Sequence, residues 1–237
     1  MTTQYQQVLT VAHKELREIV TDRGLLFSGV FFAGWFSVMT GLGVGGDEIT
    51  RQAQLNNTLF YMGALIGLFV GYIYSGQTYL REKQAGIVET LLCAPVSLRS
   101  IWIGKALGVA LPSYVMSLLA AVLITLIAGQ RAPESLVPGA TVVFHLLAVV
   151  PLFIVAAVSM LGFAQLMLGM RENMVVNMVT IMVLFGALAG TRLIVENAEF
   201  VTWTAVSVLA GSSMVLLLTT TLLGRYLSRE RIVRTIS

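Results

Sequence analysis

The residues from 81 to 105 combine charge with helical spacing and could serve chemistry or recognition. They read REKQAGIVETLLCAPVSLRSIWIGK and lie between two long hydrophobic runs. After Gly86, the apolar residues Ile87, Leu91 and Leu92 fall on one side of a short helix. A helix with one apolar and one charged face is suited to docking into a groove on a partner. We therefore predict a recognition element here rather than a catalytic one.

The boundaries of this short helix are also visible in the sequence. Proline disfavours the helical conformation in the residue before it, so Pro95 ends the helix. Ser97 is placed to cap the next helix, which continues into a hydrophobic run. The element is therefore held between two hydrophobic segments.

The sequence lacks the motifs of common catalytic and energy-coupling sites. Gly104-Lys105 has no upstream glycine of a phosphate-binding loop and is followed by Ala106. No H-E-x-x-H or G-x-S-x-G motif occurs, and the acidic residues lie in loops or at the ends of hydrophobic runs. Ion-driven carriers keep an ionisable group at membrane depth, where only His145 is available. We interpret His145 as a hydrogen-bonded packing residue, with a proton or metal role as the alternative, and predict no catalytic residue on this chain.

A stripe of methionines offers another possible chemistry. Met170, Met174, Met178 and Met182 recur every four residues. Thioethers can bind copper(I), and methionine faces adapt to varied apolar ligands. Cys93 is the only cysteine, so a disulfide framework and a cysteine-based metal cluster are excluded. We interpret the stripe as ordinary helix packing and predict no metal site.

The composition identifies the class of protein. Of 237 residues, 57% are hydrophobic and only 11% are charged, and the mean hydropathy is +0.84. Soluble domains carry about 25% charged residues. Because the basic residues cluster at the ends of hydrophobic runs, the net charge of +3 does not indicate a nucleic-acid partner. We predict an all-α, polytopic membrane protein in the lipid bilayer.

Six hydrophobic runs approach the ~20 residues that a helix needs to cross a bilayer. Pro138 is expected to open the fourth, and Pro151 to kink it. The fourth run is longer than a span requires, so a re-entrant or interfacial portion is possible there. The predicted spans are 24–44, 57–79, 97–127, one within 135–170, 173–191 and 201–224.

Residues 3–22 read as an amphipathic helix that is too charged to span. We predict that it lies in the membrane interface before the first span; a solvated helix packing on a soluble partner is the alternative. The residues assigned to the apolar face are Tyr5, Val8, Leu9, Ala12, Leu16, Ile19 and Val20, and those assigned to the polar face are Gln6, Lys14, Glu15, Arg17 and Glu18.

The basic residues also predict an orientation. Across the six spans, the 15 lysines and arginines divide unevenly, with only Arg51, Arg131 and Arg192 on the minority side. Loops rich in lysine and arginine stay in the cytoplasm. We predict that both termini and the 81–105 stretch are cytoplasmic, and that the protein lies in the cell membrane.

Glycines spaced by four residues mark faces on which helix backbones approach closely. Gly63, Gly67 and Gly71 form such a face in the second span, and Gly186 and Gly190 form one in the fifth. They predict tight packing within the bundle or between subunits.

The passage from Glu82 to Leu92, followed by Ala94-Pro95-Val96-Ser97 and Gly104-Lys105, resembles the cytoplasmic loop of ABC type-2 transporter permeases. In that family the glycine is followed by Thr-Leu-Glu, whereas Ile87-Val88 stands here before Glu89. The basic tail after Arg225 also resembles the family's ending. The resemblance extends to the topology of the whole chain.

The resemblance implies a single transmembrane domain over residues 1–237. It implies a permease without catalytic activity, most simply of an exporter, whose ATP and Mg²⁺ are bound by a separate ABC ATPase subunit. It also implies a dimeric membrane part with a second permease copy or paralogue. The segments are 1–23 for the interfacial helix, 24–79 for two spans, 80–100 for the coupling loop, 101–224 for four spans and 225–237 for the tail.

The 81–105 stretch is then the expected coupling element, with an apolar face seated on the ATPase. Glu82 and Glu89 would meet basic residues at the edge of the groove or brace the loop against Lys83 and Arg99. An ATP-independent carrier or channel, a membrane assembly factor and an intramembrane enzyme are the alternatives, and the substrate stays open. The residues assigned to coupling are Glu82, Gly86, Ile87, Glu89, Thr90, Leu91, Leu92, Pro95 and Ser97.

Overall fold

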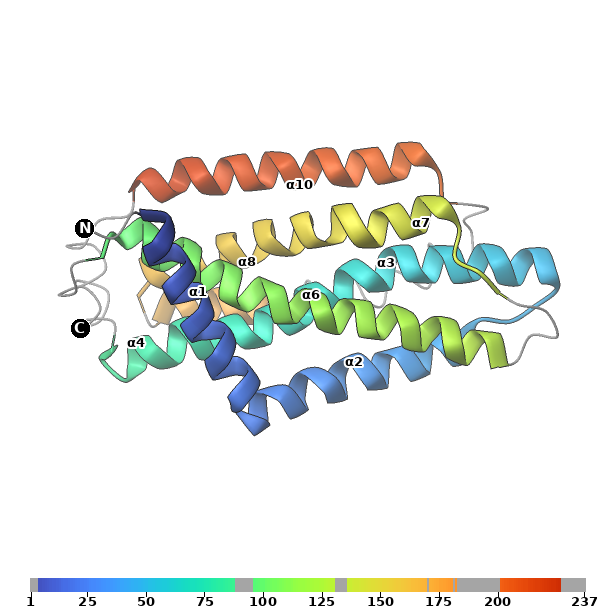
Figure 1. Cartoon of the computed structure of the whole chain (residues 1–237), viewed down its shortest axis with the longest axis horizontal. Helices are drawn as coiled ribbons and strands as arrows, with labels where there is room; N and C mark the ends of the chain where they lie inside the picture. The colour runs from blue at the N-terminus through green and yellow to red at the C-terminus, as the bar shows by residue number, and fades with distance from the viewer. Residues whose placement is uncertain are drawn as a thin grey trace.

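The computed structural model describes residues 4–87, 96–130, 136–169, 171–180, 182 and 201–226. Within these ranges the chain is helical and contains no strand, and the long helices lie side by side in an elongated bundle (Figure 1). The helices are α1 (Gln4–Thr21), α2 (Arg23–Gly43), α3 (Glu48–Ser75), the π-helix η1 (Gly76–Arg81), α4 (Glu82–Gln84), α6 (Leu98–Gln130), α7 (Ala140–Phe144), the π-helix η2 (His145–Val149), α8 (Val150–Met167), a helix over 171–180, α10 (Trp203–Leu223) and the 3₁₀ turn η3 (Gly224–Tyr226).

Five helical stretches in the described part of the chain are long and apolar enough to cross a membrane. The predicted all-helical, multi-span architecture is confirmed at this level. The predicted fifth span, 173–191, lies largely outside the described residues. The described part of it, 173–180 and 182, is helical. The five stretches are Arg23–Gly43, Glu48–Gln84, Leu98–Gln130, Ala140–Met167 and Trp203–Tyr226.

The second of these stretches is longer than the sequence suggested. A span was predicted over 57–79, but helix runs without a break from Glu48 to Gln84. Its last turns include η1, a π-helix that inserts extra residues into the helical repeat. Glu82 and Lys83 are therefore buried residues on the end of a helix rather than members of a solvated loop.

The fourth stretch accommodates a proline without breaking. Pro151 lies at the start of α8, directly after η2. A proline inside a helix removes one backbone hydrogen bond, and a π-turn is one of the local adjustments found where the ladder is disturbed. The helix begins at Ala140 with Gly139 as its cap, just after Pro138, and reaches Met167 as one helical stretch rather than a helix plus a re-entrant segment.

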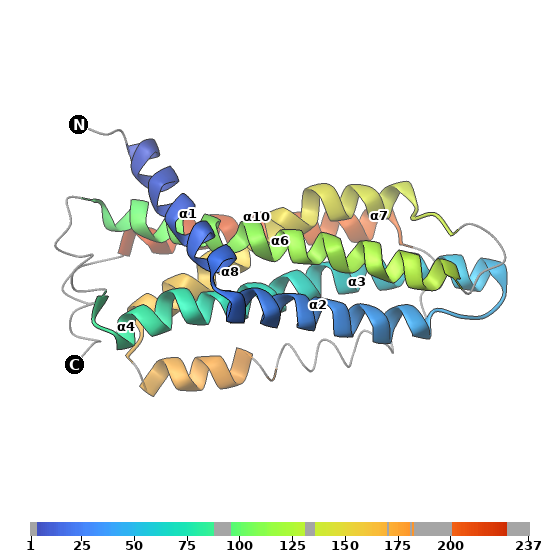
Figure 2. The same cartoon turned by 60° about the horizontal axis from the view of Figure 1, so that its bottom comes forward.

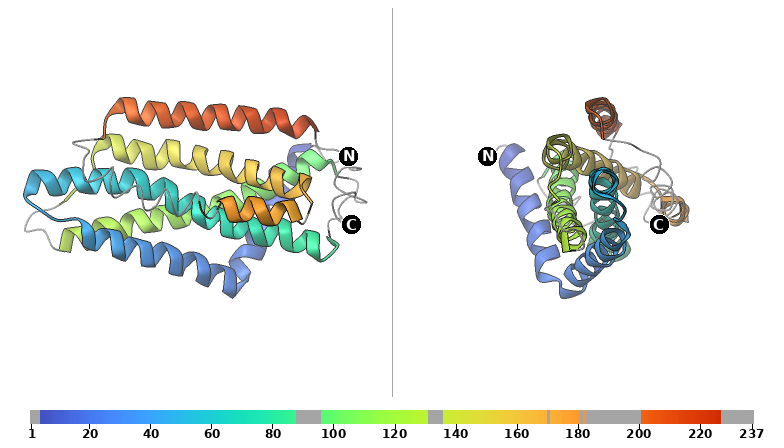
Figure 3. Two further views of the ribbon diagram at one scale, coloured as in Figure 1. Left: turned by 180° about the vertical axis from the view of Figure 1, so that it is seen from behind. Right: turned by 90° about the vertical axis from the view of Figure 1, so that its right-hand side faces the viewer.

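Helix α6 lies at the centre of the bundle, and packs against α1, α2, α3 and α8. Seen end-on, α3 and α6 occupy the middle, while α10 lies apart on one side (Figure 3). The predicted glycine face of α3 lies where other helices approach. A Cβ atom on Gly63 would lie 2.5 Å from Leu146, one on Gly71 would lie 2.9 Å from Val158, and one on Gly67 would collide with Ile154.

Helix α1 leaves the bundle axis and crosses α6 obliquely (Figure 2). The change of direction falls at Asp22, whose side chain accepts hydrogen bonds from the backbone N–H groups of Gly24 (2.9 Å) and Leu25 (3.2 Å). A side chain that satisfies these free donors starts a new helix. The chain therefore makes two helices, α1 and α2, rather than one long one.

Candidate functional site

The candidate site is the end of the bundle where most of the described charged residues gather. We call it the basic end, defined by α1, α4, the first turns of α6 and the last turns of α8 and α10. In Figure 1 it is the end on the left, where α4 lies. The 81–105 stretch enters and leaves this end, since α4 lies before residues 88–95 and α6 begins after them.

A buried lysine forms the centre of the site. The Lys105 ammonium lies 2.7 Å from a carboxylate oxygen of Glu15 and 2.7 Å from one of Glu82. The Lys105 and Glu15 side chains are each 3% exposed, and that of Glu82 is 10% exposed. Buried charges of this kind persist only when they are paired. Three helices, α1, α4 and α6, are therefore joined through one ammonium group.

A second lysine extends this network toward the surface. Lys14 lies 3.1 Å from each of Glu15, Glu82 and Glu18. Partial burial disfavours the charged form of Lys14, but the neighbouring carboxylates of Glu15 and Glu82 outweigh it and raise the pKa well above its usual value. Lys14 therefore stays protonated wherever the protein works. We call Lys14, Glu15, Glu18, Glu82 and Lys105 the ion network.

The oxygen atoms of Glu15, Glu18 and Glu82 come within 4.8 Å of one another, which is close enough for a cation. Two ammonium groups already pair with these carboxylates, however. Two positive charges face three negative ones, so the network has one excess negative charge. Its residues suit ion pairing between helices better than binding of a metal ion.

Two glycines on α6 allow α1 to approach closely enough for these pairs. A Cβ atom on Gly104 would lie 2.9 Å from the Val8 carbonyl oxygen, and one on Gly108 would lie 2.9 Å from the Ala12 carbonyl oxygen. Backbone oxygens cannot swing away as a side chain can, so these positions exclude larger residues. The four-residue glycine spacing matches that in α3, and it could have been recognised from the sequence.

An aromatic layer lies beside the ion network. Tyr79, in η1, is buried; its ring centre is 5.8 Å from the Lys105 ammonium, and its hydroxyl donates to the Trp102 carbonyl oxygen (3.3 Å). The Trp102 indole N–H in turn donates to the Ser159 carbonyl oxygen on α8 (3.1 Å). Tyr79 of the π-helix is therefore bound to α6 directly, and Trp102 connects it to α8.

Two further cations from the 81–105 stretch bind the ends of other helices. The Lys83 ammonium donates to the Leu168 carbonyl oxygen (2.6 Å) and the Leu166 carbonyl oxygen (3.4 Å), where α8 ends. Arg99 donates through Nε to the Gly224 carbonyl oxygen (3.4 Å), where α10 ends. Free carbonyls at a helix C-terminus attract cations. The two flanks of residues 88–95 therefore hold α8 and α10 as well as α1.

The structure describes four of the residues assigned to coupling. Glu82 is in the ion network, and Gly86 has φ +69°, a left-handed conformation that favours glycine. Ile87 is 46% exposed. Ser97 begins α6, because its hydroxyl accepts a hydrogen bond from the backbone N–H of Ser100 (3.1 Å). The others, Glu89, Thr90, Leu91, Leu92 and Pro95, and the glycines Gly186 and Gly190, lie outside the described residues.

Two sequence interpretations are corrected here. Glu15 was assigned to the polar face of the first helix, but it is buried against α6, whereas Tyr5 from the assigned apolar face is 70% exposed. Glu82 was expected to meet a partner protein or Lys83 and Arg99, but it binds Lys14 and Lys105. The reason is the same in both cases. A distant lysine on α6 compensates the buried carboxylates, and helical periodicity does not reveal such a partner.

The structure also describes His145 and most of the methionine stripe. His145 is fully buried, with Nε2 3.0 Å from the Phe60 carbonyl oxygen and its ring tilted by 33° against that of Phe60. Met174, Met178 and Met182 are 71%, 62% and 68% exposed, so these side chains are not buried by the part of the chain that the structure describes, contrary to the expected helix packing. Their helix packs instead through Asn173, whose amide donates to backbone oxygens at the end of α8.

Comparison with known protein families gives one result that covers this site. A family model described as "ABC-2 family transporter protein" matches residues 9–170, which is more than half of the chain. The matched range begins within α1 and includes the whole ion network. No curated protein matches the chain.

Proposed function

The chain belongs to the ABC-2 transporter family, and from this premise we propose that it is the permease subunit of an ATP-driven exporter. As a family member with several membrane-crossing helices, it is a multi-pass membrane protein. A separate ABC ATPase would hydrolyse ATP, and this chain would form the transport path together with a second permease copy.

One observation carries the coupling part of this proposal. Both flanks of residues 88–95 are bound to other helices, through Glu82 and Lys83 on one side and Arg99 and Lys105 on the other. A displacement of the segment between them would reach α1, α6, α8 and α10 together. Buried ion pairs transmit such a displacement because separating their charges is costly. This arrangement suits a segment that receives motion from an ATPase.

The positions of the helix ends support six spans. Helix α8 ends at the basic end, whereas α10 starts at the opposite end (Figure 1). A further span between Met167 and Trp203 would connect these two ends. The exposed faces of α2, α10 and the 171–180 helix would then contact lipid or the second copy.

The charge distribution supports a cytoplasmic basic end, with both termini in the cytoplasm and α1 in the membrane interface. Lys14, Arg17, Arg81, Arg99 and Arg225 all belong to the elements that meet there. Reporter fusions test this. A reporter fused after Ser237 is expected to lie in the cytoplasm. A reporter fused near Asp47 is expected to lie outside the cell. An external reporter at Ser237 would contradict the six-span topology.

Substitutions on the predicted apolar face of residues 82–97 test the coupling proposal. Changing Leu91 and Leu92 together to Asp is expected to abolish co-purification of the ATPase, because apolar anchors in the centre of an interface contribute most of its affinity. Glu89→Ala is the matched variant at the rim of the predicted helix. It is expected to retain the ATPase and to reduce transport-linked ATP hydrolysis.

Two results decide between the proposal and its alternatives. A folded double-Asp variant that loses the ATPase supports coupling through this segment. A double-Asp variant that still assembles and transports contradicts it. Purified chain that transports in liposomes without any ATPase would favour the carrier or channel alternative.

A further inference from the structure

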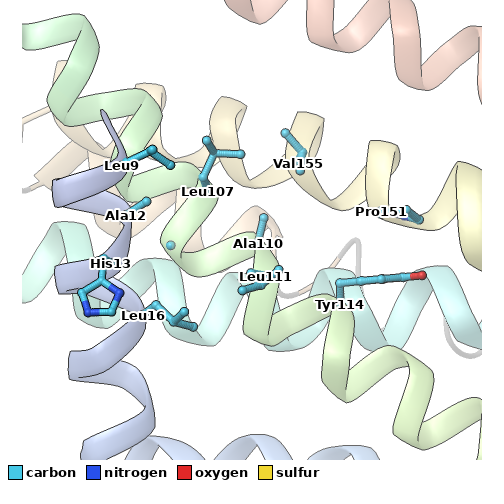
Figure 4. Close-up of a pocket in the computed structure, with 11 residues that line it drawn as sticks. Leu9, Ala12, His13, Leu16, Leu107, Ala110, Leu111, Tyr114, Pro151 and Val155 are labelled. Carbon is cyan, nitrogen blue, oxygen red and sulfur yellow. The ribbon is translucent and has the colours of Figure 1, made fainter. Parts of the chain in front are cut away.

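An apolar groove lies beneath α1, on the side of the bundle where α1 crosses α6 and faces α8. Its volume is about 350 Å³, and Leu9 and Leu16 of α1, Leu107 and Leu111 of α6, and Val155 of α8 line it. Figure 4 shows these side chains converging on the gap between the three helices. The volume is at the low end of the roughly 300–1,000 Å³ of small-molecule sites. It suits one slender apolar group better than a bulky ligand.

The groove is continuous with the surface that the spans present to the bilayer. Leu111 is 52% exposed, and the exposed apolar side chains Val115 and Leu119 follow it along α6. In a membrane protein this stripe contacts lipid tails. The acyl chain of a lipid can therefore enter the groove sideways, without leaving the hydrocarbon region.

The α1 side of the groove has a different character. His13 lines the groove and is exposed, and Arg17 lies one helical turn further on the same face of α1. Basic side chains near a membrane surface attract anionic headgroups. The groove thus offers an apolar slot with a basic rim at one end, which is the complement of a phospholipid.

We propose that this groove binds one acyl chain of a membrane phospholipid whose phosphate lies beside His13 and Arg17. The bound chain fills the space between α1, α6 and α8 and holds α1 against the bundle. The proposal rests on the membrane location of the family and not on coupling to an ATPase.

A second apolar groove provides the control. It has a volume of about 280 Å³ and lies between α3, α6 and the start of the fourth span, near the opposite end of the bundle. None of the described residues that line it is charged. Val122 is one of these residues and is 56% exposed on α6. Leu111 has a similar exposure, 52%, at the first groove.

The test uses the purified full chain in vesicles that contain a phosphatidylglycerol with a photoreactive acyl chain. We expect crosslinks in the peptides that contain Leu111 and Val155. We also expect native mass spectrometry to show one phospholipid that stays bound after detergent washing. Val155→Trp should abolish both signals because it fills the groove, whereas Val122→Trp should leave both unchanged.

A second variant tests the rim while leaving the apolar side chains of the groove in place. His13→Ala with Arg17→Ala should lower lipid occupancy about fivefold, because it removes the charge of Arg17. The proposal is overturned if the washed wild-type protein holds no phospholipid, or if Val155→Trp and Val122→Trp lose it equally. Crosslinks confined to the second groove would also overturn it. ATPase binding by these variants is measured separately, so failure of this proposal is distinguishable from failure of the coupling proposal.

Discussion

The two ends of α6 are held in different ways. At the basic end, Lys105 is buried among carboxylates, and Gly104 and Gly108 allow α1 to lie directly on the helix. Near the other end, Gly129 has no atom of a neighbouring element within 4 Å of a possible Cβ atom, and Leu126 is 58% exposed. The helix is therefore held by buried charges at one end and by apolar packing of one face, which includes the fully buried Ile124 and Ala128, at the other.

The loops at the opposite end are bound by neutral side-chain amides and by Arg51, which donates to the Gly46 carbonyl oxygen (2.6 Å). Asn56 accepts a hydrogen bond from the Gly139 N–H (2.9 Å), and Gln52 donates to the Val137 carbonyl oxygen (2.6 Å). Neutral bonds of this kind contribute about 1 kcal/mol each. Removing one partner of a buried ion pair is far more costly. The comparison indicates that helix positions at the basic end depend on a few charged residues.

The largest effect is expected from Lys105→Met, which removes the buried partner of Glu15 and Glu82 and leaves them only the half-exposed Lys14. We expect the free energy of unfolding to fall by about 3–5 kcal/mol. Asn56→Ala, the matched change at the opposite end, should cost only about 1 kcal/mol. Denaturant unfolding of both purified variants in the same detergent gives the measurement.

A compensating variant separates charge from packing. Lys105→Met combined with Glu15→Gln and Glu82→Gln removes the whole central set of charges, and should recover most of the lost stability. Equal losses for Lys105→Met and Asn56→Ala would show that the two ends are held equally well, and the comparison would fail.

Much of the architecture was predictable because its signals are local. Hydropathy runs identify spans, and four-residue glycine spacing identified the face of α3 that meets other helices. The pairing of Lys105 with Glu15 was not predictable in this way, since the two residues are 90 positions apart. An amphipathic pattern treats every charge as facing water, so it placed Glu15 on the wrong side of α1.

The extent of α3 escaped prediction for a related reason. Glu82 and Lys83 look like the start of a polar loop, and the predicted span ended before them. In the structure they continue the helix because Lys14 and Lys105 neutralise Glu82 and the end of α8 accepts Lys83.

A smaller effect, of opposite sign at the two ends of α6, is expected from adding one methyl group. Gly108→Ala would place Cβ 2.9 Å from the Ala12 carbonyl oxygen and 2.7 Å from the Glu15 Cβ, so we expect a loss of about 1–3 kcal/mol. Gly129→Ala enters open space, and should stabilise the helix by about 0.5–1 kcal/mol.

Unfolding midpoints of the two glycine variants measure this difference. Limited trypsin digestion adds a local readout, because cleavage after the exposed Arg17 should accelerate in Gly108→Ala when α1 loosens. If Gly108→Ala is as stable as Gly129→Ala and resists trypsin equally, α1 does not depend on close contact with α6.

The smallest effect is expected in the helix that begins at the basic end without sharing its ion network. Asn173 is buried there, but Met174 and Met178 on the next turns are 71% and 62% exposed. Replacing both with Leu should change the free energy of unfolding by less than about 0.5 kcal/mol, because exposed substitutions of similar size rarely matter. Transport should also be retained, since both side chains are mostly exposed.

Met160→Leu is the matched internal control for this prediction. The Met160 sulfur lies 3.8 Å from the Thr220 hydroxyl on α10, so its replacement should cost more than the exposed pair, although still under about 1.5 kcal/mol. Unfolding and transport are measured for both variants, with and without copper(I). If the Met174→Leu and Met178→Leu protein folds normally but loses a copper-dependent activity, the exposed thioethers are ligands. The basic end would then have two roles, the joining of helices by ion pairs and the binding of copper by thioethers.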